Sequence, residues 1–166
     1  MTRFAEVTHH EWIAAPEGRV RSQFADLQHH IDSSVHPKLR FEILRSEPRS
    51  ARYVQEVRLL GIRQRDVFER SFRLDGTMVD TSVEGFNRGG SLSFQFRPEL
   101  RDARPGTDVQ ITVRLPLPPV IGGLIRPLLE GQIRRELRTA AAEDKRDIEV
   151  RGYPRVAAPR ADLRAA

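Results

Sequence analysis

The sequence has no cysteine among its 166 residues. That absence excludes disulfides, thiolate metal ligands and cysteine nucleophiles. The first residues contain no apolar core of the length found in signal peptides. No run approaches the roughly 20 apolar residues of a membrane-spanning helix. We therefore expect a cytoplasmic protein with no membrane span.

Lysine is also scarce, because only Lys38 and Lys145 accompany the many arginines. Lysine and arginine together number 28 against 23 acidic residues, so the net charge is +5. A basic chain can bind nucleic acid, and the arginine-rich face of the last helix is the candidate surface. However, acidic residues are interleaved with the arginines, as in residues 134–136. A mixed-charge solvated surface is the simpler interpretation, and we expect no nucleic-acid partner.

A long amphipathic helix is predicted from Pro127 to Glu149. Its apolar positions recur at helical spacing, and most arginines fall on the other side. No second helix of this length exists to pack against it, so its apolar stripe must lie on a sheet. The stripe consists of Leu128, Leu129, Gln132, Ile133, Glu136, Leu137, Ala140 and Ala141.

Strands are predicted where apolar and polar residues alternate. Six of the seven follow one another with short links, which favours an antiparallel meander. The prediction is thus an α+β fold, with a seven-stranded antiparallel sheet wrapped around the long C-terminal helix. The strands are expected at residues 4–13, 38–46, 51–60, 63–74, 77–86, 91–97 and 107–115.

The segments outside these strands are less regular. Glu17 to Leu27 has apolar residues at helical spacing and is predicted to form a short amphipathic helix, whereas residues 28–37 are polar, end at a proline and are expected to be irregular. Residues 102–106 are expected to form the turn between the last two strands. The end of the chain is rich in Arg, Ala and Pro and has little to bury, so we predict one domain over 1–150 and a mobile basic tail over 151–166.

The order of these elements resembles the helix-grip fold of the START-like superfamily, which includes the polyketide cyclases. The segment WIAAPEGRVRSQFAD is similar to the family's strand end and first helix, with Val20 and Asp26 at the usual positions and Arg21 where a tryptophan is common. PGTDVQITVRLPL is similar to the last turn and strand, with Pro105 replacing a glycine. The resemblance covers roughly residues 4–149. It implies two short helices after the first strand and a cavity between sheet and long helix, but no particular chemistry.

The apolar face of the strands is expected to line that cavity in part. The alternative is that these side chains simply fill a core. We expect ligand contacts from Leu39, Phe41, Phe68, Phe72, Leu92, Phe94, Phe96 and Val113. From the long helix, Gln132 and Glu136 are candidates to orient a polar group of the ligand, although side chains at the edge of the stripe more often reach water.

Arg70 lies between Phe68 and Phe72 on the same predicted strand face, with Asp66 four residues earlier. If this face looks inward, a buried guanidinium needs Asp66 or an anionic ligand as its partner. In that case removing the charge should alter stability little. If the strand twists, Arg70 reaches solvent instead.

His29, His30, Asp32 and His36 cluster in the sequence, and such groups can exchange protons or bind metal. The alternative is that they face solvent or cap local turns. Their spacing fits no standard zinc pattern, so we expect no metal and no other cofactor. His30 and His36 remain acid–base candidates.

The predicted function is binding of a hydrophobic, aromatic or polyketide-like small molecule by a monomer or homodimer. Cyclisation of the aromatase/cyclase type would use Arg70 to hold an oxyanion or carboxylate, and His30, His36 or Tyr53 to move protons. The alternative is a non-catalytic carrier or sensor of a lipid-like ligand.

Overall fold

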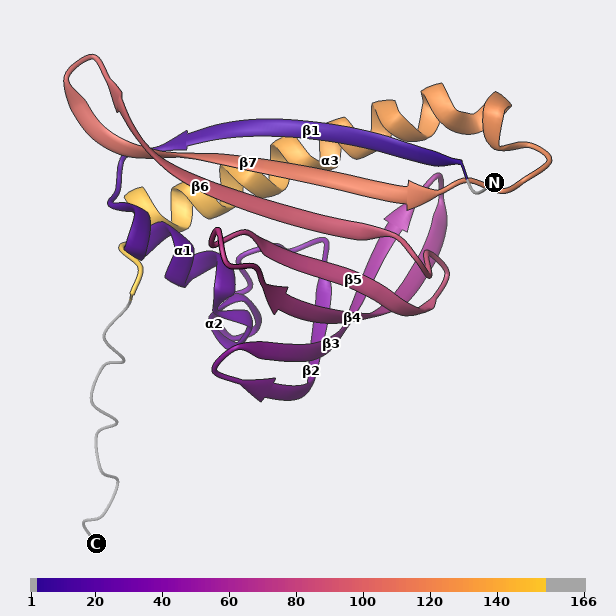
Figure 1. The fold of residues 1–166 in the computed structure, drawn as a ribbon, viewed down its shortest axis with the longest axis horizontal. Helices are drawn as coiled ribbons and strands as arrows, with labels where there is room; N and C mark the ends of the chain where they lie inside the picture. Colours follow the sequence, from indigo (N-terminus) through magenta and orange to yellow (C-terminus); the bar gives the residue numbers. More distant parts are fainter. Residues whose placement is uncertain (1–2, 155–166) are drawn as a thin grey trace, which may run out of the picture.

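The computed structural model describes residues 3–154. One sheet, two short helices and one long helix make up this part of the chain (Figure 1). The elements in chain order are β1 Phe4–Ile13, α1 Glu17–Ala25, α2 Leu27–Asp32, β2 Arg40–Glu47, β3 Ser50–Leu59, β4 Ile62–Phe72, β5 Met78–Gly85, β6 Ser91–Arg101, β7 Arg104–Pro116 and α3 Gly122–Glu149.

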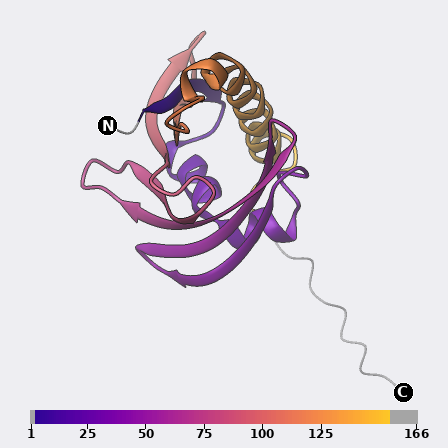
Figure 2. The same ribbon diagram turned by 90° about the vertical axis from the view of Figure 1, so that its right-hand side faces the viewer.

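The seven strands form one antiparallel sheet in the order β1-β7-β6-β5-β4-β3-β2. Strands β2 to β7 form a meander, and β1 extends the sheet at one edge by pairing with β7. Figure 2 shows that the sheet curves and that α3 lies across its concave face. The predicted fold class is therefore confirmed. No helix in the described residues is long and apolar enough to cross a bilayer.

The long helix ends at Glu149 as predicted, but it begins at Gly122, five residues before Pro127. Proline is compatible with a first helical turn, and for that reason the sequence predicts the helix start at Pro127. In the structure it lies in the second turn, where the backbone hydrogen bond that Gly123 would accept is missing. The buried positions of α3 follow the predicted spacing and continue it as Leu137, Ala141, Asp144 and Ile148.

The hairpin between β6 and β7 is longer than the sequence indicates. The turn was expected over residues 102–106, but only Asp102 and Ala103 connect the strands, both with positive φ angles of 48° and 59°. Pro105 instead pairs with Leu100 inside the hairpin. Proline is tolerated there because β7 is paired with β1 only as far as Thr107, so the end of the hairpin is a two-stranded ribbon with free edges.

The helical segment after β1 is divided into two. The α1 helix ends at Ala25, and Asp26 starts α2 by accepting a hydrogen bond from the backbone N–H of His29 at 2.9 Å. An aspartate is a preferred N-cap residue. The expectation of irregular structure from residue 28 was therefore wrong as far as Asp32, whereas the two short helices implied by the family resemblance are present.

Ordered structure continues past the end of α3. The Tyr153 side chain is only 7% exposed, and its hydroxyl donates to Asp26 Oδ2 at 3.0 Å. Its ring lies 4.7 Å from the ring of His29, and its carbonyl accepts from Arg19. The first residues of the predicted tail thus pack on α1 and α2; residues 155–166 of that tail lie outside the described part of the chain.

Replacing Tyr153 with alanine is expected to lower the free energy of unfolding by about 2 kcal/mol, because a buried aromatic ring and its hydrogen bond are both lost. Chemical denaturation of the full chain measures this. Tyr153→Phe is the matched control, which keeps the ring and should lose only about 1 kcal/mol. An alanine variant as stable as the parent would show that Tyr153 does not anchor the end of α3.

Candidate functional site

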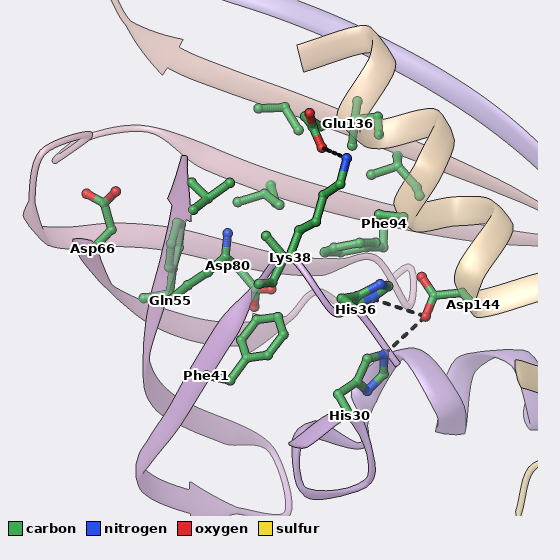
Figure 3. Close-up of a pocket in the computed structure, with 18 of the residues that line it drawn as sticks. His30, His36, Lys38, Phe41, Gln55, Asp66, Asp80, Phe94, Glu136 and Asp144 are labelled. Atoms are coloured by element: carbon green, nitrogen blue, oxygen red, sulfur yellow. Dashed lines mark hydrogen bonds and ion pairs between the residues drawn. The ribbon is translucent and has the colours of Figure 1, made fainter. Parts of the chain in front are cut away.

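A cavity of about 170 Å³ lies between the concave face of the sheet and α3 (Figure 3). It is large enough for on the order of ten waters, or for a small organic molecule. Most of its wall is apolar, with polar groups gathered at a few places. Among the predicted residues, those on the wall are Leu39, Phe41, Phe68, Leu92, Phe94, Val113 and Glu136, together with Arg70, His30, His36 and Tyr53.

Three predicted wall residues lie elsewhere. Phe96 packs edge-on against Phe24 in the main core, at 5.5 Å between ring centroids, and Phe72 packs beside the same core. Gln132 turns away from the cavity, and its Oε1 accepts from the backbone N–H of Leu60 at 2.5 Å. Leu60 lies in the β3–β4 turn, where a free backbone donor needs a partner. Strand alternation and helical spacing identify a face, but not the part of it that the cavity meets.

Aromatic rings form a continuous row along one wall. The centroid of His36 lies 6.4 Å from that of Phe41, and Phe41 lies 6.1 Å from Tyr53. Tyr53 in turn stacks on Phe68 at 5.6 Å. The first two ring pairs are tilted, with 57° and 56° between their planes, and the third is stacked at 21°. Together these rings form a polarisable wall that suits a ligand with aromatic rings.

Arg70 faces inward, as its strand position predicts, and is 6% exposed. Its partner is Asp80 on β5 rather than Asp66. The Arg70 Nε and Nη2 atoms donate to the two carboxylate oxygens of Asp80 at 2.7 and 2.8 Å. Nη1 donates to the backbone carbonyls of Phe24 and Ala25 at 3.3 and 3.2 Å. The expectation of a guanidinium paired with Asp66 or left for a ligand is therefore wrong, because β4–β5 pairing places Asp80 directly opposite Arg70.

Tyr53 belongs to the same buried network. Its hydroxyl donates to Asp80 Oδ2 at 2.8 Å. Burial first, and then the Asp80 carboxylate, raise the pKa of Tyr53 well above its ordinary value. The hydroxyl therefore stays protonated and serves as a hydrogen-bond donor.

Asp66 has a different set of partners at another end of the cavity (Figure 3). It accepts from the backbone N–H and the side-chain amide of Asn87, at 2.6 and 2.8 Å, and from the Ser82 hydroxyl at 3.1 Å. These bonds hold the loop between β5 and β6 onto β4. Gly85 completes the loop with a φ of 113°, and a side chain there would collide with the Arg65 carbonyl.

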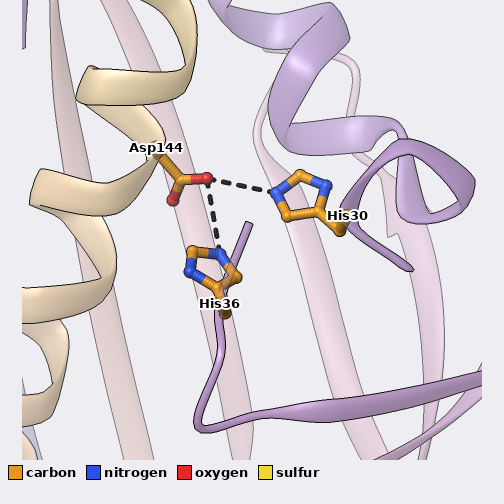
Figure 4. Close-up of side chains that lie close together, drawn as sticks. All are labelled: His30, His36 and Asp144. Atoms are coloured by element: carbon orange, nitrogen blue, oxygen red, sulfur yellow. Dashed lines mark hydrogen bonds and ion pairs between the residues drawn. The ribbon is translucent and has the colours of Figure 1, made fainter. Parts of the chain in front are cut away.

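Two of the clustered histidines meet an aspartate of α3 at the opposite end (Figure 4). His30 lies on α2 and His36 on the loop after it. Their Nε2 atoms lie 3.1 and 3.4 Å from the same oxygen, Oδ1 of Asp144. His29 is not part of this group, because its Nε2 contacts Asp147 at 2.6 Å. Asp32 faces outward and accepts from Gln28 at 2.8 Å.

His36 lies between two carboxylates. Its Nδ1 is 2.8 Å from Glu143 Oε2, and its Nε2 faces Asp144. Burial lowers the pKa of His36, but Asp144 and then Glu143 outweigh burial and raise it to about 9. Burial raises the pKa of Asp144. The two histidines outweigh burial and hold the pKa of that carboxyl well below its ordinary value.

Lys38 and Glu136 mark the place where the cavity meets solvent. Both residues line the cavity, and their charged groups lie 3.8 Å apart (Figure 3). The Lys38 side chain is largely exposed, so this pair is screened and contributes little to stability. It can therefore open without a large cost.

Sequence reasoning missed Asp80 and Asp144. Asp144 had a usable signal, because it falls on the buried stripe of α3 three residues after Ala141, and a carboxylate on an apolar stripe demands a partner. Asp80 lies opposite Arg70 because the β4–β5 hairpin pairs Phe72 with Met78 and keeps that register as far as Phe68; the irregularity at Val67–Phe68 lies beyond these pairs. The Asp75-Gly76 turn signal could therefore have located Asp80 if the hairpin had been paired outward from it.

No protein-family model and no curated protein sequence matches the chain. Solved structures do match in fold. TTHA0849 from Thermus thermophilus has a TM-score of 0.74 at 21% identity, covering 86% of this chain and 96% of its own. A START superfamily protein from Mycobacterium smegmatis has a TM-score of 0.68 at 16% identity, covering 86% of this chain and 98% of its own. The Zhui aromatase/cyclase from Streptomyces sp. R1128 has a TM-score of 0.66 at 18% identity, covering 90% of this chain and 99% of its own. The chain therefore has the START-like helix-grip fold.

Proposed function

We propose that this protein binds a small hydrophobic molecule with one or more aromatic rings in the cavity between the sheet and α3. The observation that carries this proposal is the row of rings from His36 through Phe41 and Tyr53 to Phe68, opposite the apolar face of α3. Pockets of this kind bind through apolar area and use a few polar groups for orientation. The same fold in an aromatase/cyclase supports a ring-containing or ring-forming ligand.

The polar groups at the two ends of the cavity are already paired within the protein. The Asp66 carboxylate has both oxygens engaged by donors, and the His30–His36–Asp144 group is likewise paired internally. Arg70 is engaged by Asp80, so we assign it to the wall of the cavity rather than to anion binding. Binding therefore depends mainly on shape and apolar contact.

N-phenyl-1-naphthylamine, an uncharged aromatic probe that fluoresces in apolar surroundings, tests the proposal. The protein should bind it at one site. Leu92→Trp, which adds bulk at a partly buried position on the cavity wall, should weaken binding by about tenfold or more, equivalent to about 1.4 kcal/mol. Ser93→Trp is the matched control, because it adds the same side chain to the opposite face of β6.

Two results would contradict this assignment. One is the absence of probe binding by the parent protein. The other is equal affinity in Leu92→Trp, which would place the probe outside the cavity. An obvious alternative site is the exposed apolar surface near the start of α3, formed by Val120, Ile121, Leu124 and Leu128.

A second candidate function is ring closure of a polyketide-like chain. It is favoured by the number of proton-bearing groups that reach one aromatic-walled cavity, since His30, His36 and Tyr53 all lie on the wall. In this case the rings would fold the reactive chain, and the histidines would exchange protons with it. The two functions differ in one observable: a carrier releases its ligand unchanged, whereas a cyclase that closes and dehydrates the ring releases a product lighter by one water, which mass spectrometry detects.

A further inference from the structure

Three side-chain atoms that are suited to metal binding converge beside the cavity. They are the Nε2 atoms of His30 and His36 and Oδ1 of Asp144 (Figure 4). The ligand atoms of these three residues all lie within 4.8 Å of one another. All three residues are buried, and all three line the cavity. The group therefore combines two imidazoles and one carboxylate in a site that is shielded from bulk water.

The second nitrogen of each ring is held by an acceptor. Nδ1 of His30 lies 2.7 Å from the carbonyl oxygen of Asp26, and Nδ1 of His36 lies 2.8 Å from Glu143 Oε2. Each Nδ1 thus donates its proton outward, which turns Nε2 toward Asp144. Histidines that bind metals are typically fixed in this way, by a backbone carbonyl or a carboxylate on the other ring nitrogen.

The spacing also fits a metal ion. A tetrahedral ion with ligands at 2.0–2.1 Å holds its ligand atoms about 3.4 Å apart. The two distances to Asp144 Oδ1, 3.1 and 3.4 Å, are close to this separation, and the ligand atoms of the two imidazoles lie no more than 4.8 Å apart. The ion would take the place of the proton that His36 Nε2 shares with Asp144.

Local charge favours a dication at this place. Asp144 and Glu143 both face His36. Asp147 is linked to Asp144 through Gln23, whose side-chain amide donates to Asp144 Oδ1 at 3.0 Å and to Asp147 Oδ2 at 3.3 Å. Two carboxylates therefore contact the two histidines, and a third lies one hydrogen-bonded amide away. A divalent ion offsets two of these negative charges.

We propose that His30, His36 and Asp144 bind a divalent transition-metal ion of the zinc or iron class, with its remaining coordination positions facing the cavity. Imidazole and carboxylate ligands suit these metals. Three protein ligands leave room for an exchangeable one, as in catalytic rather than structural sites. A hydroxyl, carbonyl or carboxylate oxygen of the cavity's ligand can occupy that position. Metal binding itself does not depend on the function proposed above, because it needs no organic ligand.

The test is zinc binding to the full chain without an affinity tag, after treatment with a chelator. Isothermal titration should show one Zn²⁺ per chain. His36→Gln and Asp144→Asn should lose this binding. His10→Gln is the matched control, because His10 forms a comparable histidine–aspartate pair with Asp108, at 3.0 Å, but on the exposed outer surface. Its zinc binding should equal that of the parent.

Absence of stoichiometric zinc binding by the parent chain would overturn the proposal, as would unchanged binding by His36→Gln. Circular dichroism shows whether each variant is folded. If the substitutions at the buried positions unfold the chain, X-ray absorption at the zinc edge of the parent protein decides. Two imidazole ligands and at least one oxygen are expected, and a spectrum with fewer than two imidazoles would refute the site.

Discussion

Replacing Arg70 with methionine is expected to lower the free energy of unfolding by about 3–5 kcal/mol, the range found when one partner of a buried ion pair is removed. The substitution roughly keeps the bulk of the side chain but leaves the Asp80 carboxylate without its two charged hydrogen bonds. Asp80 is fully buried, and the Tyr53 hydroxyl is the one side-chain donor that would remain to it among residues 3–154. Two backbone carbonyls at the end of α1 would lose their donor as well. Urea denaturation monitored by circular dichroism measures the effect.

Arg52→Met is the matched control for this experiment. Arg52 lies on the neighbouring strand β3 and also forms ion pairs, with Glu69 and Glu84, but on the outer and more exposed face of the sheet. Pairs of that kind contribute about 0–1 kcal/mol, so this variant should be nearly as stable as the parent. If Arg70→Met were equally mild, the Arg70–Asp80 pair would not be buried as the structure shows.

A triple variant separates the cost of an unpaired charge from the value of the pair itself. Arg70→Met, Asp80→Leu and Tyr53→Phe together replace the network by apolar side chains of similar shape. Such replacements are often neutral or stabilising, because no buried charge remains to be desolvated. We expect the triple variant to recover most of the stability lost in Arg70→Met. If stability is not recovered, the hydrogen bonds and ion pair of the network stabilise the folded state by more than the cost of burying its charged groups.

In metal-free buffer with a chelator, stability should fall by about 3 kcal/mol as the pH rises from about 6.5 to about 9. The reason is that the pKa of His36 is about 9 in the folded protein and 6.5 ordinarily. A group whose pKa is raised by folding stabilises the folded state below its unfolded pKa, and this contribution is lost as the pH rises through the folded value. A shift of this size corresponds to about 3 kcal/mol.

Asp144 acts in a different pH window. Its pKa is lowered on folding, so its contribution is present above its ordinary pKa and is lost only as the pH falls through the acidic range. It therefore adds no slope between pH 6.5 and 9. Since the His36–Asp144 pair contributes to both shifts, they partly describe the same interaction and are not summed.

Denaturation midpoints measured across this pH range provide the test, with two variants for comparison. His36→Gln should remove most of the slope, because no titrating group remains between Glu143 and Asp144. His10→Gln should keep it. A parent protein whose stability is flat from pH 6.5 to 9 would show that His36 is not held as a cation in the folded state.

The sequence by itself determined the architecture. Alternation at period two marked the strands, and helical spacing marked α3. The links between strands are too short for the crossovers that parallel strands need, so an antiparallel meander follows. The inward direction of Arg70 also followed, because Phe68 and Phe72 share its face while Arg65 and Glu69 face outward. These are local rules: each depends on residues a few positions apart, so they can be read along the chain.

Only the tertiary structure decided which groups meet inside. Asp80 lies opposite Arg70 only when the β4–β5 hairpin has formed, and Asp144 reaches His30 and His36 from more than a hundred residues away, when α3 crosses the concave face of the sheet. The limits of the cavity, which exclude Phe72, Phe96 and Gln132, likewise depend on how far the sheet curves around α3. Which buried charged groups pair with one another depends on distances across the fold, because hydrogen-bond and electrostatic energies change steeply with distance. The spacing of residues in the sequence does not give these distances.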